Sequence, residues 1–60
     1  MKKNNKEFFK VNDLAKILDV NVMTIYRYIK AKKLKAYKIG KEYRINKQEF
    51  NRFLESVKTI

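Results

Sequence analysis

The chain has 60 residues, with 16 Lys or Arg against 6 Asp or Glu, and its formal net charge is +10. A chain this short forms one small domain, which buries only about 60% of the surface that its unfolded state exposes. It contains neither cysteine nor histidine, which removes disulfides, thiolate metal sites and the usual general base. We therefore expect no enzyme activity, no metal site and no cofactor. The strong positive charge favours a polyanionic partner, above all nucleic acid.

The N-terminal segment lacks the features of a membrane or export signal. No apolar run approaches the roughly 20 residues of a membrane-spanning helix, and the opening MKKNNKEFFK has no apolar stretch of signal-peptide length. We therefore expect a cytoplasmic protein. Residues 1–7 are expected to form a flexible basic tail, and residues 8–60 the folded domain. The segment FFKV either adds a strand or covers the core.

Two short helices are predicted in the first half. Within residues 11–20, Leu14, Ile17 and Leu18 have the spacing of one buried helical stripe. The three residues Asp19–Asn21 separate this helix from a second one at 22–31, where Asn21 is a favourable N-cap. The core side of the second helix is expected to hold Val22, Ile25, Ile29 and part of Tyr28. Its outward side is expected to hold Met23, Arg27 and Lys30, flanked by Thr24 and Tyr26.

A β-hairpin is predicted in the stretch KAYKIGKEYRI, which holds the only glycine of a chain without proline. Apolar residues alternate on both sides of Gly40, and a tight turn needs a residue that tolerates positive φ. Two registers are open. Pairing Ile39 with Tyr43 would bring the apolar side chains of both strands to one face. A two-residue turn at Gly40 and Lys41 would instead pair Ile39 with Glu42.

The C-terminal segment, residues 46–60, has the clearest helical pattern. Asn46 followed by Glu49 resembles a capping box. The apolar residues that recur at the spacing of one helical face are Phe50, Phe53, Leu54 and Val57. The predicted order is helix, turn, helix, hairpin, helix, which is an α+β fold.

The first two helices suggest a function, because two short helices joined by a three-residue turn are typical of the helix-turn-helix motif. In that motif the second helix lies in the major groove, and its N-terminal residues contact base edges. An ordinary helical hairpin has the same spacing, but the outward side of this second helix carries basic and polar residues and no acid. A basic, glycine-tipped hairpin that follows is typical of a wing, which contacts phosphates or enters the minor groove.

The residues expected to bind DNA come from the second helix and the hairpin. They are Asn21, Met23, Thr24, Tyr26, Arg27, Lys30, Lys38, Gly40, Lys41 and Arg44. Arg27 is the best candidate for guanine, because its guanidinium fork can bind O6 and N7 together. The residues expected to contact mainly phosphates are Lys30, Lys38, Lys41 and Arg44.

An ordered set of pieces, LAKILDV, TIYRYI, KLKAYKIG, YRI and FL, resembles the excisionase-like DNA-binding domains, relatives of the MerR-type winged helix-turn-helix. The resemblance covers roughly residues 9–54. It implies a small winged helix-turn-helix, composed of a helix-turn-helix, a two-stranded wing hairpin and a C-terminal helix. It also implies a recognition helix at Asn21–Ala31, a wing centred on Gly40, and double-stranded DNA as the ligand.

Four positions depart from this family. Glycine is usual where this chain has Asp19 and Lys32, and proline is frequent where Lys35 stands. Asp tolerates the left-handed backbone region better than most residues, so we expect the turn to be kept. The usual Ser or Thr before the first helix corresponds to Lys10, which predicts a weak cap at that end.

The resemblance implies an architectural role, in which side-by-side copies on tandem sites bend DNA and direct a recombinase or integrase toward excision. MerR-type regulators continue into a long dimerising helix, whereas this chain stops shortly after Val57, so a ligand-sensing activator is not expected. One alternative is a small phage- or plasmid-type transcriptional regulator. Another, of a different class, is a basic protein that binds anionic membranes. The separate helical and strand periodicities favour a folded core over a membrane-bound amphipathic helix.

Overall fold

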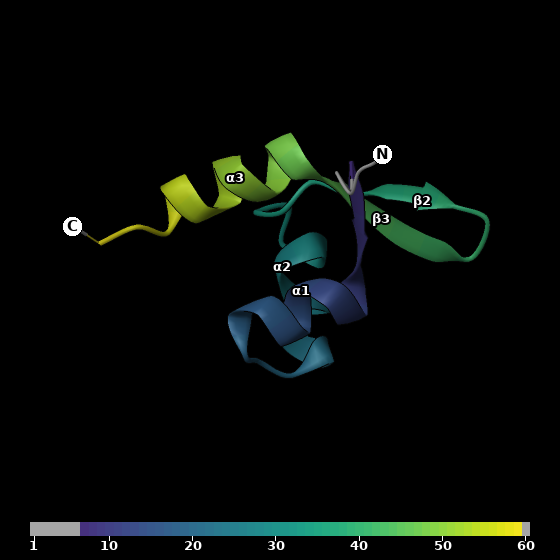
Figure 1. The fold of residues 1–60 in the computed structure, drawn as a ribbon, viewed down its shortest axis with the longest axis horizontal. Coiled ribbons are helices and arrows are strands. Elements are labelled where there is room, and N and C mark those ends of the chain that lie inside the picture. The colour runs from purple at the N-terminus through teal and green to yellow at the C-terminus, as the bar shows by residue number, and fades with distance from the viewer. Residues whose placement is uncertain (1–6, 60) are drawn as a thin grey trace, which may run out of the picture.

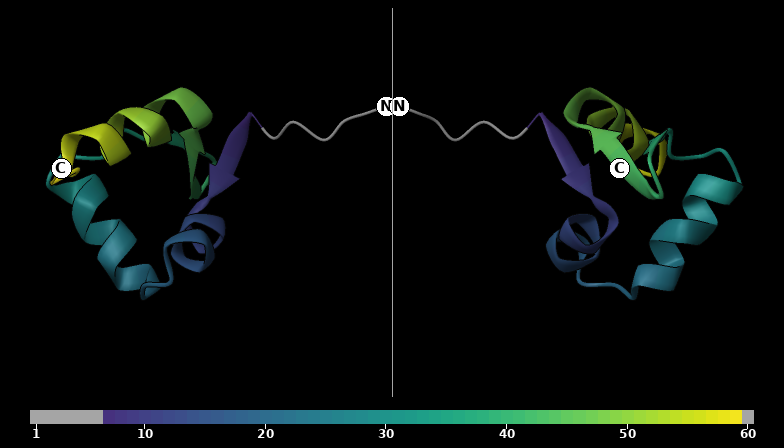
Figure 2. Two further views of the ribbon diagram at one scale, coloured as in Figure 1. Left: turned by 60° about the vertical axis from the view of Figure 1, so that its left-hand side comes forward. Right: turned by 90° about the vertical axis from the view of Figure 1, so that its right-hand side faces the viewer.

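The computed structural model describes residues 7–59 and shows three helices and a small sheet (Figures 1 and 2). The elements are β1 (Phe8–Lys10), α1 (Val11–Leu18), α2 (Val22–Lys30), β2 (Tyr37–Ile39), β3 (Glu42–Asn46) and α3 (Lys47–Ser56). The predicted α+β winged helix-turn-helix is confirmed, with β1 as an additional strand. Residues 1–6 of the expected tail lie outside the described residues. The carbonyl of Glu7 accepts a hydrogen bond of 2.9 Å from the backbone N–H of Lys47.

The sheet has three antiparallel strands in the order β1-β3-β2. Ile39 pairs with Glu42, so the two-residue turn at Gly40 and Lys41 is confirmed and the pairing of Ile39 with Tyr43 is wrong. Gly40 has φ +66°, as the first turn position of a type II′ hairpin requires. The turn geometry determined the register because the side chains of β2 do not pack in the core, so burial favours neither register. Ile39 remains 57% exposed.

This register divides the side chains of the hairpin between two faces, because successive residues of a strand point in opposite directions. Tyr43 and Ile45 point to the inner face, which looks toward the helices, and Lys38 lies opposite Tyr43 on β2. The outer face carries Glu42, Arg44, Tyr37, Ile39, Lys10 and Phe8. The rings of Phe8 and Tyr37 meet edge-to-face across β3, with centroids 5.9 Å apart.

The turn between α1 and α2 keeps the backbone conformation that glycine would adopt. Asp19 has φ 56° and ψ 50°, in the left-handed region, which confirms the expectation that Asp can replace glycine there. The backbone N–H of Val20 donates to the carbonyl of Ala15 at 2.9 Å, closing the end of α1. Asn21 then caps α2, because its Oδ1 accepts from the N–H of Met23 at 2.9 Å.

The two remaining helix starts differ in the quality of their caps. Asn46 ends β3 and also caps α3, with its Oδ1 accepting from the N–H of Gln48 at 2.7 Å. At the start of α1, the carboxylate of Asp13 accepts from the N–H of Lys10 at 2.9 Å. That hydrogen bond is one of the two in a capping box. The other would run from the backbone N–H of Asp13 to the side chain of residue 10, and a lysine side chain has no acceptor. The expected weak cap is confirmed.

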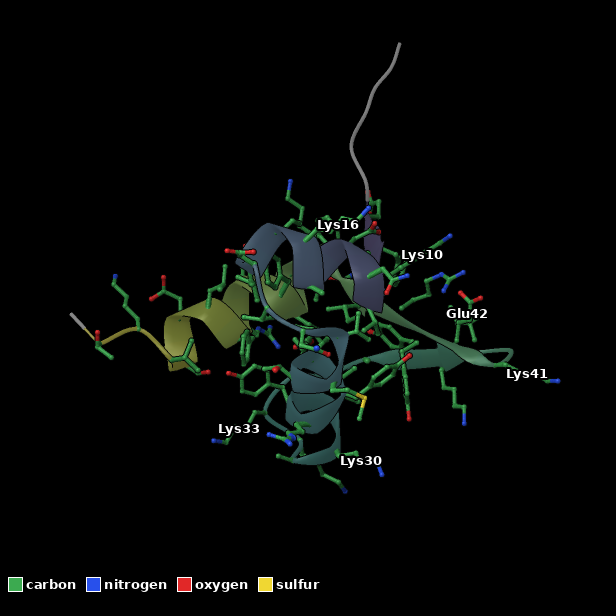
Figure 3. All side chains as sticks on the ribbon, turned by 90° about the horizontal axis from the view of Figure 1, so that it is seen from below. Lys10, Lys16, Lys30, Lys33, Lys41 and Glu42 are labelled. Atoms are coloured by element: carbon green, nitrogen blue, oxygen red, sulfur yellow. The ribbon has the colours of Figure 1, made fainter. Side chains whose placement is uncertain are left out.

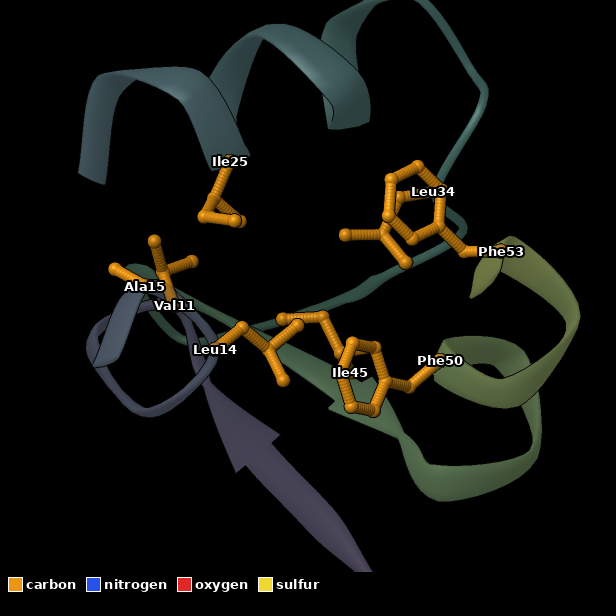
Figure 4. Close-up of a cluster of buried hydrophobic side chains, with 8 residues drawn as sticks. All are labelled: Val11, Leu14, Ala15, Ile25, Leu34, Ile45, Phe50 and Phe53. Carbon is orange, nitrogen blue, oxygen red and sulfur yellow. The ribbon is translucent and has the colours of Figure 1, made fainter. Parts of the chain in front are cut away.

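The core is assembled from every part of the domain, as Figure 4 shows. Its buried residues are Val11, Leu14, Ala15, Ile25, Leu34, Ile45, Phe50 and Phe53. The four that are almost fully buried come from four different segments, namely α1, α2, the loop before β2, and β3. Each helix and the sheet therefore depend on the same small apolar cluster.

Three residues of the predicted stripes lie outside this core. Ile17 is 56% exposed, because the stripe that α1 turns toward the core runs through Val11, Leu14, Ala15 and, in part, Leu18, and Ile17 lies beside it. Leu54 is 36% and Val57 46% exposed, since α3 begins at the end of β3 and runs away from the sheet (Figure 1). Only Phe50 and Phe53, from its first two turns, are buried.

Lys32 provides a test of backbone strain, because its φ is +63° just after α2. A residue with a Cβ loses about 1–2 kcal/mol in this region. Lys32→Gly is therefore expected to be more stable than Lys32→Ala by about 1 kcal/mol, the reverse of their order in a helix interior. Both variants remove the same charge, and urea denaturation measures the difference. The pair Lys33→Gly and Lys33→Ala is the control, and an identical order at both positions would contradict the explanation.

Candidate nucleic-acid interface

The outward side of α2 is set by the burial of its opposite side. Ile25 has no exposed surface, and Val22, Tyr28 and Ile29 pack partly against the core. Met23 is in consequence 62% exposed, and Arg27 and Lys30 are also exposed, whereas Thr24 is half-buried. The two sides predicted from the helical period are confirmed. Asn21 lies at the start of this surface, but its Oδ1 is used for the cap.

The wing places its basic residues at the tip and on both faces. Gly40 and Lys41 form the exposed tip, and no heavy atom beyond Gly40 and its two chain neighbours lies within 4 Å of the position that a Cβ on Gly40 would occupy. Figure 3 shows Lys30 and Lys33, near the end of α2, at one edge of the molecule, and Lys41 extending outward from the tip of the wing beside α2. Lys10 and Lys16 project from the opposite side.

Two tyrosines join α2 to the wing. The rings of Tyr26 and Tyr43 meet edge-to-face, with centroids 6.1 Å apart and an interplanar angle of 62°. The ammonium of Lys38 lies 5.8 Å from the centroid of the Tyr43 ring, within the range of a cation–π interaction. Tyr26, which is 37% exposed, consequently lies at the edge of the outward side of α2, next to the wing. Lys38 is held on the side of the wing that faces α2.

Arg44 does not join these residues. It lies on the outer face of the hairpin, opposite Tyr37 and Lys10. Its Nη1 donates to Oε1 of Glu42 at 2.7 Å and to the carbonyl of Tyr43 at 3.3 Å. The hydrogen bond and the charge of Arg44 lower the pKa of the Glu42 carboxyl, and the charge of Lys10 adds to this effect. Glu42 is thus ionised near neutral pH and offsets the charge of Arg44.

Two residues of this surface were not among those predicted from the sequence. Lys33 belongs to a run of lysines that follows α2, and that run was the available signal. Tyr43 was assigned to the apolar face of the hairpin, and its contact with Tyr26 depends on a strand register that the sequence left open.

Residues 7–59 contain no cluster of three or more Asp, Glu, His or Cys side chains fit to hold a metal ion. Within the same range, no helix combines the length and the apolar character needed to cross a bilayer.

Comparison with known families agrees with this geometry. The model of the helix-turn-helix domain family matches residues 8–58, almost the whole chain. The chain belongs to this helix-turn-helix family. Searches among curated proteins and among solved structures gave no match. As a helix-turn-helix domain, the protein binds double-stranded DNA in a sequence-specific manner.

Glu42 provides a test of the wing of this helix-turn-helix protein. Glu42→Gln removes a negative charge next to the tip and frees the guanidinium of Arg44. DNA affinity is expected to rise about two- to fivefold, and the slope of log K against log salt to become steeper by up to about 1. Fluorescence anisotropy over a salt series measures both quantities.

The control for this change is Glu55→Gln. Glu55 lies in α3, whose C-terminal end and the wing are at opposite ends of the molecule in Figure 1. Glu55→Gln removes the same charge as Glu42→Gln and should change the affinity for DNA much less. Equal effects of the two variants would mean that net charge alone, rather than the position of Glu42, determines binding.

Proposed function

We propose that this protein is an excisionase-type factor, which directs a recombinase or integrase of a mobile element by binding and bending DNA. In this proposal α2 lies in the major groove, with Met23, Thr24, Tyr26 and Arg27 toward the bases. The wing contacts phosphates or the adjacent minor groove through Lys38, Gly40 and Lys41. Arg44 contributes once its pairing with Glu42 loosens.

The observation that carries the proposal is that the wing, with Lys41 at its tip, lies beside α2 (Figure 3). The contact between Tyr26 and Tyr43 brings β3 of the wing against the same helix. Glu42 projects from the wing on the side of Lys10 (Figure 3), where it pairs with Arg44. Such a surface suits a duplex whose phosphates flank the groove that α2 occupies.

The assignment of base and phosphate contacts is tested with two truncations. Arg27→Ala is expected to cost about 1–3 kcal/mol of binding free energy and to relax sequence preference at one position. Lys41→Ala should weaken binding to all sequences alike and reduce the salt slope by about 1. Lys16→Ala removes the same charge from the opposite side and serves as the control. A binding titration in which Arg27→Ala kept both affinity and preference would show that the proposed orientation of α2 is wrong.

The small size of the domain favours the binding of several copies. One helix of nine residues and one short hairpin form the proposed surface, and a single module of this size contacts little DNA. We therefore propose side-by-side copies on tandem sites, which also provides the architecture for bending. The alternative role of a small phage- or plasmid-type regulator uses the same surface and differs in where the sites lie.

Footprinting on the DNA around its own gene separates these roles. An excision factor should protect repeated sites beside an attachment site and raise the yield of excised circle when it is added to the element's recombinase. Protection that is confined to a promoter, with no change in excision, would instead assign promoter control. Absence of protection on any DNA would contradict the proposal itself.

A further inference from the structure

The hairpin is held to the rest of the protein by few residues. All three residues of β2 are exposed, and so are Gly40 and Lys41 at the tip. On the central strand, Ile45 is fully buried and anchors the base of the wing. Tyr43 is the next residue on the inner face, and beyond it the strand offers only Glu42 on the outer face and then the turn. Tyr43 is thus the outermost residue of β3 that faces the helices.

Tyr43 makes two contacts that bear on DNA binding. Its ring meets that of Tyr26 on α2, with centroids 6.1 Å apart. Among the ring contacts within the described range, this one alone joins α2 to the hairpin. The other contact is with Lys38, its partner across the strands, whose ammonium lies 5.8 Å from the ring centroid.

These contacts restrict both the wing and its lysine. An edge-to-face pair is worth about 0.5–1.5 kcal/mol beyond its buried area, and an exposed cation–π pair about 0.5–1 kcal/mol. Holding a lysine in place before binding reduces the side-chain entropy that is lost when it meets a phosphate. A wing without these contacts would move relative to α2 and would reach the DNA less often in the productive position.

We propose that Tyr43 is a positioning residue for DNA binding. It fixes the angle of the wing to α2 through Tyr26, and it directs the ammonium of Lys38 toward the space between helix and wing. It acts through these two neighbours rather than through a contact of its own with DNA. This inference rests on the proposed roles of α2 and the wing.

The first test removes the ring and keeps the apolar bulk. Tyr43→Leu is expected to weaken binding about three- to tenfold. Its hydroxyl-radical footprint should lose protection at the positions covered by the wing and keep protection at those covered by α2. Tyr43→Phe retains both ring contacts and should bind within about twofold of the unmodified protein. Tyr37→Leu makes the same chemical change on the outer face of the hairpin and should leave affinity and footprint unchanged.

A double-mutant cycle then isolates the effect on Lys38. Lys38→Ala should weaken binding in the unmodified protein and have little further effect in the Tyr43→Leu background, because coupled residues are not additive. Circular dichroism verifies that each variant is folded. Should Tyr43→Leu fail to fold, Tyr26→Leu removes the same ring contact from the more exposed partner and should also lose the wing part of the footprint.

The outcomes separate this inference from the proposed function. If Tyr43→Leu, or Tyr26→Leu in its place, keeps the unmodified affinity and the full footprint, the positioning role is refuted. An equal cost of Lys38→Ala in both backgrounds refutes the link to Lys38. If the unmodified protein gives no footprint near its gene, the proposed function fails first, and that result is visible before any variant is made.

Discussion

The pairing of β3 with its two neighbours is the constraint on which the rest of the molecule depends. β3 joins β1 to β2, ends in the residue that caps α3, and inserts Ile45 into the core. Truncating a fully buried Ile or Leu costs about 2–5 kcal/mol, and a domain of this size is stable by only a few kcal/mol. The central strand therefore determines both whether the domain folds and which side chains face α2.

Features that depend on local chemistry were predictable from the sequence. The side chains of Asn21 and Asn46 cap their helices as expected, and the 3.6-residue period separated the two sides of α2. The hairpin was less predictable, because turn preference and apolar alternation favoured different registers. Glycine at the first turn position prevailed, leaving Ile39 exposed on a strand that no other element covers.

Errors in the predicted core have a common physical origin. A periodic stripe shows which face of a helix is apolar, but it does not show how much of that face, in width or in length, the neighbouring elements cover. In α1 the covered strip runs from Val11 through Leu14 to Leu18, and Ile17 beside it is exposed. α3 is covered near Phe50, so Val57 is exposed. The contact between Tyr26 and Tyr43 could not be predicted for a similar reason. It joins α2 to β3, and the packing of these two elements against each other is set by the tertiary structure.

The tip of the wing uses glycine for its backbone rather than for lack of space. Gly40 has φ +66°, and a Cβ there would meet nothing within 4 Å, so only the handedness of an L-residue opposes a side chain at this position. A mirror-image amino acid has the opposite preference. D-alanine, introduced by chemical synthesis of the 60-residue chain, would suit the turn and at the same time add a methyl group at the tip. Such a chain would distinguish the torsional role of glycine from its role in close approach to a ligand.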